Sequence, residues 1–292
     1  MKLASVVQIT TPKKFALFGL WYGPQKPRRV IIVVHGLCSS VFSRINREIP
    51  QQLADSKTAV LTFNNRGHDI VSSVYSVNPY GKTLKAGGAH EIFTDCVDDI
   101  RGAVLFVKKK GVREIYLAGH STGCQKAVYY AYKIQKQSHV TGIILLAPVS
   151  DYAAAQKTDK KGRLARAVGK ARKLVQSGKK HELLSASLLT QWSVNDAQRF
   201  LSLYTPDSVE TIFPYEQTGK VPRLLRSIKK PILVLWAEKD QYNDRPAKKI
   251  RDWFVEHLKK GDQVVIIPGV HHGFRGQEKR VARTIHSWIS NL

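Results

Sequence analysis

The stretch Ile115-Tyr116-Leu117-Ala118-Gly119-His120-Ser121-Thr122-Gly123 carries the strongest indication of the fold. Its first four residues form a short apolar run that predicts a buried strand, and a helical pattern begins near Thr122. A Gly-x-Ser-x-Gly sequence between a strand and a helix predicts a turn too tight for bulky side chains two residues from Ser121. Such a turn would expose the Ser121 hydroxyl above the sheet, where the helix amino terminus favours developing negative charge. His120 is expected to pack beside the turn.

Similar apolar runs predict further strands on both sides of this turn. They cover residues 30–34, 59–63, 115–118, 142–147, 231–237 and 263–267. Helical patterns lie at about residues 43–54, 91–110, 122–137, 244–260 and 276–290. This alternation predicts an α/β fold with a mostly parallel sheet and helices on both faces. Two earlier strands, at about residues 3–9 and 14–22, have a short connection and are expected to form an antiparallel edge.

The alternation stops between residues 151 and 229, where the pattern is helical without strands. A basic amphipathic stretch covers residues 160–176, and shorter helices are expected at residues 185–190 and 194–204. We therefore expect residues 1–150 and 230–292 to form the core domain. Residues 151–229, called the insertion below, are expected to form a helical lid over the carboxyl edge of the sheet.

Two residues on loops after predicted strands can complete the chemistry of Ser121. A serine at neutral pH is a weak nucleophile that needs a base, and the base needs an orienting carboxylate. Asp240 follows the strand ending at Ala237, and His272 follows the strand ending at Ile267. Open parallel sheets place their active sites at such carboxyl ends. The alternatives are His271 for the base and Glu238, Asp244 or Asp151 for the acid.

The chain resembles the α/β-hydrolase fold family over nearly all of its length. The resemblance rests on the Ser121 turn, the order serine, acid, histidine, and the Gly-Phe that follows His272. It also rests on His35-Gly36-Leu37-Cys38 and Asn65-Arg66-Gly67-His68, although family members often have Asp at position 65 and Gly at position 68. The resemblance implies an eight-stranded sheet and an oxyanion hole formed by the backbone N–H groups of Leu37 and Thr122.

By this resemblance, the chain is a serine hydrolase, most simply a carboxylesterase, with Ser121, His272 and Asp240 as its triad. Among family members it is most similar to small intracellular esterases, acylglycerol lipases and acyl-peptide or siderophore-ester hydrolases with helical lids. The residues expected to contact substrate are His35, Gly36, Trp192, Phe213, Tyr215 and Tyr242. Amide or C–C bond hydrolysis by the same triad is an alternative. Another is a non-catalytic protein of this fold that binds an anionic ligand or surface through the basic lid.

No cofactor and no metal is expected. The chain has ten histidines, yet none stands in H-E-x-x-H or a comparable local spacing. It has no phosphate-binding G-x-x-x-x-G-K-[ST] loop either, and Gly81, Gly87 and Gly88 are interpreted as flexible turn residues of a long loop. Three well-separated cysteines exclude a disulfide framework. Because neither a signal-peptide core nor a membrane span is visible, we expect a soluble cytoplasmic protein.

The 292 residues include 47 Lys and Arg against 22 Asp and Glu, which gives a net charge of +25. Ten of these cations lie between residues 151 and 180, against two Asp. No aromatic residue lies between Ala153 and Lys180, so nucleic acid is an improbable partner. A solvated lid helix whose apolar stripe covers the active site explains the stretch most simply. Attraction of an anionic ester substrate and peripheral contact with an anionic membrane are the alternatives.

Overall fold

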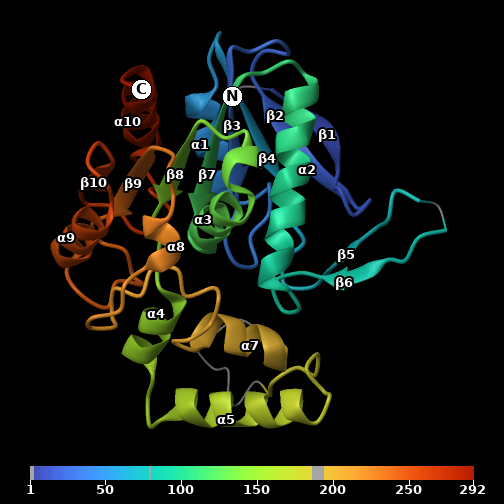
Figure 1. The fold of residues 1–292 in the computed structure, drawn as a ribbon, viewed down its shortest axis with the longest axis vertical. Helices are drawn as coiled ribbons and strands as arrows, with labels where there is room; N and C mark the ends of the chain where they lie inside the picture. The colour runs from blue at the N-terminus through green and yellow to red at the C-terminus, as the bar shows by residue number, and fades with distance from the viewer. Residues whose placement is uncertain (1–2, 79, 186–193) are drawn as a thin grey trace.

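An eight-stranded sheet forms the centre of the computed structural model, which describes residues 3–78, 80–185 and 194–292 (Figure 1). The strand order is β1-β2-β4-β3-β7-β8-β9-β10. The bounds are β1 (Ala4–Thr10), β2 (Ala16–Tyr22), β3 (Arg29–Val34), β4 (Thr58–Phe63), β7 (Glu114–His120), β8 (Gly142–Leu146), β9 (Ile232–Ala237) and β10 (Gln263–Ile267). Strands β3, β4 and β7 to β10 are parallel, whereas β1 and β2 form an antiparallel edge. The predicted sheet is therefore confirmed.

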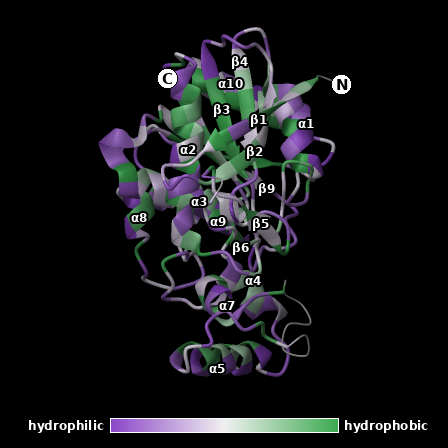
Figure 2. Cartoon of the chain, turned by 90° about the vertical axis from the view of Figure 1, so that its right-hand side faces the viewer, coloured by the Kyte–Doolittle hydropathy of each residue, from purple (hydrophilic) through white to green (hydrophobic). Residues whose placement is uncertain are grey.

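Helices cover both faces of the sheet because its central strands carry apolar side chains on both faces. In β3, Val30, Ile32 and Val34 face one hydrophobic core, and Ile31 and Val33 face the other. The first core includes α2 (Cys96–Lys109), α3 (Thr122–Ile134) and α9 (Ala247–His257). The second includes α1 (Arg44–Leu53) and α10 (Glu278–Ser290). Figure 2 shows the hydrophobic residues concentrated in these strands.

The insertion lies beyond one end of the sheet, below it in Figure 1. Its described helices are α4 (Asp151–Thr158), α5 (Arg163–Gln176), α7 (Ala197–Tyr204) and α8 (Arg223–Arg226). The apolar stripe of α5 packs into a small separate core with Phe200 and Leu203 of α7. The apolar stripe of α5 therefore packs against α7 and does not line the cavity that contains Ser121. The expectation that it covers the active site is wrong. Apart from Ser185, the helix predicted at residues 185–190 lies outside the described residues.

A hairpin of β5 (Ser72–Val74) and β6 (Leu84–Ala86), with the 3₁₀ turn η1 (Phe93–Asp95), occupies what the sequence indicated was a long loop. Gly87 has φ +97°, as expected of a turn residue. Gly88 has a different role, because a Cβ there would overlap the Sγ atom of Cys38. A second 3₁₀ turn, η2 (Gln135–Ser138), follows α3. None of the helices in the described ranges is long and apolar enough to cross a bilayer.

Candidate active site

Ser121 lies on a strained turn between β7 and α3. Its backbone has φ +56° and ψ −129°, which is unfavourable for a residue with a side chain and costs about 1–3 kcal/mol. The neighbouring glycines allow the turn. A Cβ on Gly119 would lie 2.5 Å from the Cys124 nitrogen, and one on Gly123 would overlap the Val34 carbonyl. The fold thus maintains a strained conformation at the one serine that the sequence pattern singles out.

The loop after β3 passes directly beside Ser121. A Cβ on Gly36 would lie 2.8 Å from the Ser121 Cβ, so only glycine fits at this position without displacement. Leu37 follows it and lines the same cavity as Ser121. Thr122 is the first residue of α3, where backbone N–H groups have no partner within the helix. The backbone path therefore suits the oxyanion hole expected at Leu37 and Thr122.

His272 is hydrogen-bonded to Asp240, with 2.7 Å between Nδ1 and Oδ2. The Asp240 side chain is fully buried, and its Oδ1 accepts a hydrogen bond from the Tyr242 backbone nitrogen at 3.0 Å. Because a carboxylate can only accept, the His272 Nδ1 carries the proton and Nε2 is left as the basic nitrogen. This is the arrangement that a histidine base requires.

The alternative base and acids are not paired with His272: Asp151 lines the cavity, but its carboxylate accepts from Gln125. His271 is exposed, whereas His272 is buried. The Glu238 carboxylate accepts from the Gly269 nitrogen at 2.7 Å, and Asp244 pairs with Arg245 at 2.7 Å. Among these candidates, the structure brings together His272 and Asp240.

Two aromatic side chains hold the His272 ring. The ring centroids of His120 and Tyr242 lie 4.7 Å and 4.8 Å from that of His272. His120 Nε2 also donates to the His272 carbonyl oxygen at 3.1 Å. Burial, followed by the nearby His272, lowers the pKa of His120 to about 3. His120 is therefore a neutral positioning residue that packs beside the turn.

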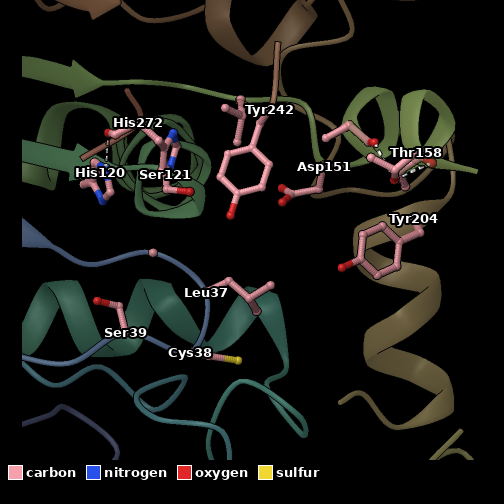
Figure 3. A pocket seen from close by; sticks show the side chains of 14 residues that line it. Leu37, Cys38, Ser39, His120, Ser121, Asp151, Thr158, Tyr204, Tyr242 and His272 are labelled. Atoms are coloured by element: carbon pink, nitrogen blue, oxygen red, sulfur yellow. Dashed lines mark hydrogen bonds between the residues drawn. The ribbon is translucent and has the colours of Figure 1, made fainter. Parts of the chain in front are cut away.

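Ser121 and His272 open into one cavity of about 410 Å³ (Figure 3). The structure shows no hydrogen bond from the Ser121 hydroxyl to His272, although such bonds often form only once substrate is present. The cavity lining consists of Gly36, Leu37, Cys38, Ser39, His120, Ser121, Val149, Asp151, Ala154, Ala155, Thr158, Tyr204, Tyr242 and His272. It contains no Lys or Arg from the described ranges.

Of the residues expected to contact substrate, Gly36 and Tyr242 line the cavity. Trp192 lies outside the described residues. His35 does not line the cavity, because both its ring nitrogens fix the backbone: Nδ1 lies 2.9 Å from the Gly36 oxygen, and Nε2 lies 3.2 Å from the Asn65 nitrogen. Burial, followed by the positive charge of Lys126, lowers the pKa of His35 to about 3.

Phe213 and Tyr215 also differ from their expected positions, because both are buried in the core. The Phe213 ring packs at 5.5 Å from that of Phe254. The Tyr215 ring contacts Trp236, and its hydroxyl accepts from the Ser150 nitrogen at 2.9 Å. The Tyr215 hydroxyl thus binds the residue just before α4, and neither side chain lines the cavity.

Asp151 and Tyr204 are cavity residues that the sequence did not assign to substrate contact. Asp151 is the first residue of α4, and its Oδ2 accepts from Gln125 Nε2 at 2.9 Å. Burial, followed by the Glu210 carboxylate, raises the pKa of Asp151 to about 7. Tyr204 is the last residue of α7. Its contact with the cavity depends on how the insertion folds, so no sequence pattern indicated it.

A buried ionic network joins the helix after Ser121 to the insertion. Lys126 of α3 is fully buried, and its Nζ lies 2.5 Å from Glu91 Oε1 and 3.3 Å from Asn65 Oδ1. Glu91 also pairs with Arg199 of α7 at 2.9 Å, and Arg199 pairs with Glu210. Although burial raises the pKa of Glu91, Lys126 and Arg199 lower it overall.

Comparison with known proteins gives a family and a fold. Residues 83–290 match the family described as protein of unknown function (DUF1749). None of the curated proteins is detectably similar in sequence. The siderophore hydrolase EstB from Aspergillus fumigatus shares 15% identity over 100% of this chain and 98% of its own, with a TM-score of 0.69.

Two further solved structures have the same fold. Est1E from Butyrivibrio proteoclasticus, described with bound ferulic acid, shares 17% identity over 98% of each chain, with a TM-score of 0.62. The α/β hydrolase GrgF from Penicillium sp. sh18 shares 16% identity over 99% of this chain and 98% of its own, with a TM-score of 0.67. This chain therefore has the α/β-hydrolase fold.

Proposed function

Because the chain belongs to the family described as protein of unknown function (DUF1749), whose description gives no reaction, we propose its function from the site: it is a serine hydrolase that cleaves carboxylic esters. The observation that carries the proposal is the hydrogen bond between His272 and the buried Asp240, formed in the same cavity as Ser121. The strained backbone of Ser121 supports it, because folding has to maintain that conformation.

In the proposed reaction, the Ser121 oxygen attacks the ester carbonyl while His272 Nε2 takes the hydroxyl proton. Asp240 holds the imidazole in the required tautomer and stabilises its charged form. His272 then gives the proton to the departing alcohol, which leaves an acyl group on Ser121. A water molecule, activated by the same nitrogen, attacks this acyl-enzyme, and the acid product and free Ser121 are formed.

We assign the oxyanion hole to the backbone N–H groups of Leu37 and Thr122. Negative charge develops on the carbonyl oxygen in both steps, and each fixed donor stabilises it by about 3–4 kcal/mol. Backbone donors need no reorganisation during the reaction. Their position depends on the close approach of Gly36 to Ser121.

The cavity favours a small or medium ester with an uncharged acyl group. Its volume of about 410 Å³ lies near the lower end for small-molecule sites. Its acidic lining residue is Asp151, whose raised pKa of about 7 leaves it partly protonated near neutral pH, whereas the exposed cations of α5 lie outside the lining in the described structure. The insertion supplies one wall through α4 and Tyr204, which supports its proposed role as a lid.

Hydrolysis of an ester panel with graded acyl length tests this function. We expect turnover by the wild type, with a preference for short to medium acyl groups, and loss of turnover in Ser121→Ala. Ser39→Ala is the matched control, because Ser39 lines the same cavity but its hydroxyl bonds to Ser43 at 2.7 Å. Equal turnover in the wild type and Ser121→Ala would refute the nucleophile. Turnover of amides alone would favour the amidase alternative.

A further inference from the structure

A second group of ligand side chains lies outside the cavity. His90, His181 and Asp196 each offer one ligand atom, and these atoms lie within 4.8 Å of one another. The Nδ1 atoms of both histidines lie 3.0 Å from the same Asp196 oxygen, Oδ2. None of the three residues lines the candidate active site.

The backbone fixes Asp196 at the centre of this group. Its side chain is fully buried, and Oδ1 caps α7 by accepting from the Arg199 nitrogen at 2.8 Å. Only Oδ2 is therefore directed at the imidazoles. The Asp196 nitrogen also donates to the Ala89 carbonyl at 2.8 Å, which holds the residue beside His90.

The two histidines differ in exposure. The His90 side chain is 4% exposed, whereas that of His181 is 53% exposed. A short antiparallel pairing keeps His181 next to Asp196: the Ala197 nitrogen donates to the Glu182 oxygen at 3.0 Å, beside a bridge between Leu183 and Asp196. The group thus has a rigid buried half and an open side through which an ion can enter.

We propose that His90, His181 and Asp196 bind one divalent transition-metal ion, with Zn²⁺ as the best fit. Two imidazole nitrogens and one carboxylate oxygen are ligands that Zn²⁺ prefers. The 3.0 Å separations need little change, because neighbouring ligands of a tetrahedral zinc lie about 3.3 Å apart. Three protein ligands leave a fourth position for water on the exposed His181 side.

The bound ion would join the core to the insertion. His90 belongs to the core segment before η1, whereas His181 and Asp196 come from two segments of the insertion. Because none of the three ligands lines the candidate active site, the proposal is independent of ester hydrolysis. The sequence contains no local metal motif because the three ligands come from positions 90, 181 and 196 and meet only in the folded chain.

Titration of the chelator-treated full-length protein with Co²⁺ tests the proposal, because Co²⁺ shares the ligand preferences of Zn²⁺ and absorbs visible light when bound. We expect one equivalent of Co²⁺ to bind, Zn²⁺ to displace it, and the melting temperature to rise by a few degrees with Zn²⁺. His181→Ala should weaken binding at least about tenfold, since even outer-shell changes cost that much.

Two further variants make the result specific. His139→Asn, which changes an exposed histidine outside the group, should bind Co²⁺ as the wild type does. Asp196→Asn retains an acceptor for the Arg199 nitrogen but removes the charge, and it should bind more weakly than the wild type. Unchanged Co²⁺ binding in folded His181→Ala and Asp196→Asn would overturn the proposal. No binding by the folded wild type at about 100 µM Co²⁺ would also overturn it.

Discussion

At the residue scale, the account depends on the close approach of two backbone segments at Ser121. The Gly36 position lies against the Ser121 Cβ, and the two glycines of the turn leave no space for side chains. The side chains of the proposed triad could be placed on loops from sequence, because each follows an apolar run. The Gly-Phe after His272 favoured it over His271 from the sequence, and the fold agrees, because it buries the His272 imidazole against Asp240 and exposes His271.

Substitution Gly36→Ala should reduce kcat by about 100-fold or more, because the new Cβ would lie 2.8 Å from the Ser121 Cβ and displace the oxyanion donor. The measurement is steady-state hydrolysis of a neutral ester. Gly169→Ala is the matched control, because a Cβ there meets no atom within 4 Å and activity should be unchanged. A fully active Gly36→Ala would exclude Leu37 as an oxyanion donor.

Asp151 gives a pH dependence of stability. Its pKa of about 7 in the folded protein exceeds the ordinary value of 3.8, so between pH 4 and 7 the folded state binds more protons than the unfolded state. The contribution of Asp151 to the free energy of unfolding therefore falls as pH rises from 4 to 7. Asp151→Asn should remove this fall and be more stable than the wild type at pH 8, by on the order of 2 kcal/mol.

Urea denaturation of both proteins between pH 4 and 8 provides the measurement. The control is Asp207→Asn, which changes an exposed carboxylate and should leave the pH profile unaltered. If the stability difference between Asp151→Asn and the wild type does not grow with pH, Asp151 has an ordinary pKa.

At the element scale, α3 and α7 are joined through charges rather than apolar contacts. Lys126 and Arg199 are both fully buried and share Glu91. Sequence periodicity could predict each helix but not this network, because a lone Lys within a helical pattern is ordinarily solvated. The hairpin of β5 and β6 could not be predicted for a different reason: its three-residue strands are too short to show a period.

Substitution Lys126→Met should lower the free energy of unfolding by about 3–5 kcal/mol, because it leaves the buried Glu91 with one cation fewer. The double variant Lys126→Met/Glu91→Gln should recover part of that loss, since it removes the uncompensated charge. Urea denaturation measures both. Arg251→Met, in the exposed pair with Asp252, is the control and should cost less than about 1 kcal/mol. Additive losses in the double variant would contradict coupling between Lys126 and Glu91.

Across the whole molecule, the cations that give the net charge of +25 lie outside the cavity, because no Lys or Arg of the described residues lines it. Runs of apolar residues were sufficient to predict the α/β sheet and its parallel centre, because each central strand is buried on both faces, whereas the short connection between the first two strands predicted the antiparallel edge. Helices of the insertion could be predicted from the sequence, but how they pack against each other could not. Its apolar stripes could pack over the cavity or against each other, and only the fold shows that α5 packs on α7.

This separation predicts that hydrolysis of a neutral ester is insensitive to salt. Between about 50 and 500 mM NaCl, kcat/KM should change less than about twofold, because screening acts on charges outside the cavity. Steady-state kinetics across this range measures it. A tenfold fall in kcat/KM would contradict this separation, because it would show that charges screened by salt act on the site.

If Ser121 is the nucleophile, it becomes covalently bonded during the reaction, and intact-protein mass spectrometry with a fluorophosphonate probe detects this bond. We expect one adduct on the wild type, located at Ser121 by peptide mapping and absent from Ser121→Ala. We also expect slower labelling in Asp240→Asn, because the hydrogen bond between His272 and Asp240 sets the tautomer of the base. A folded wild-type protein that remains unlabelled, or is labelled at another residue, would contradict the account.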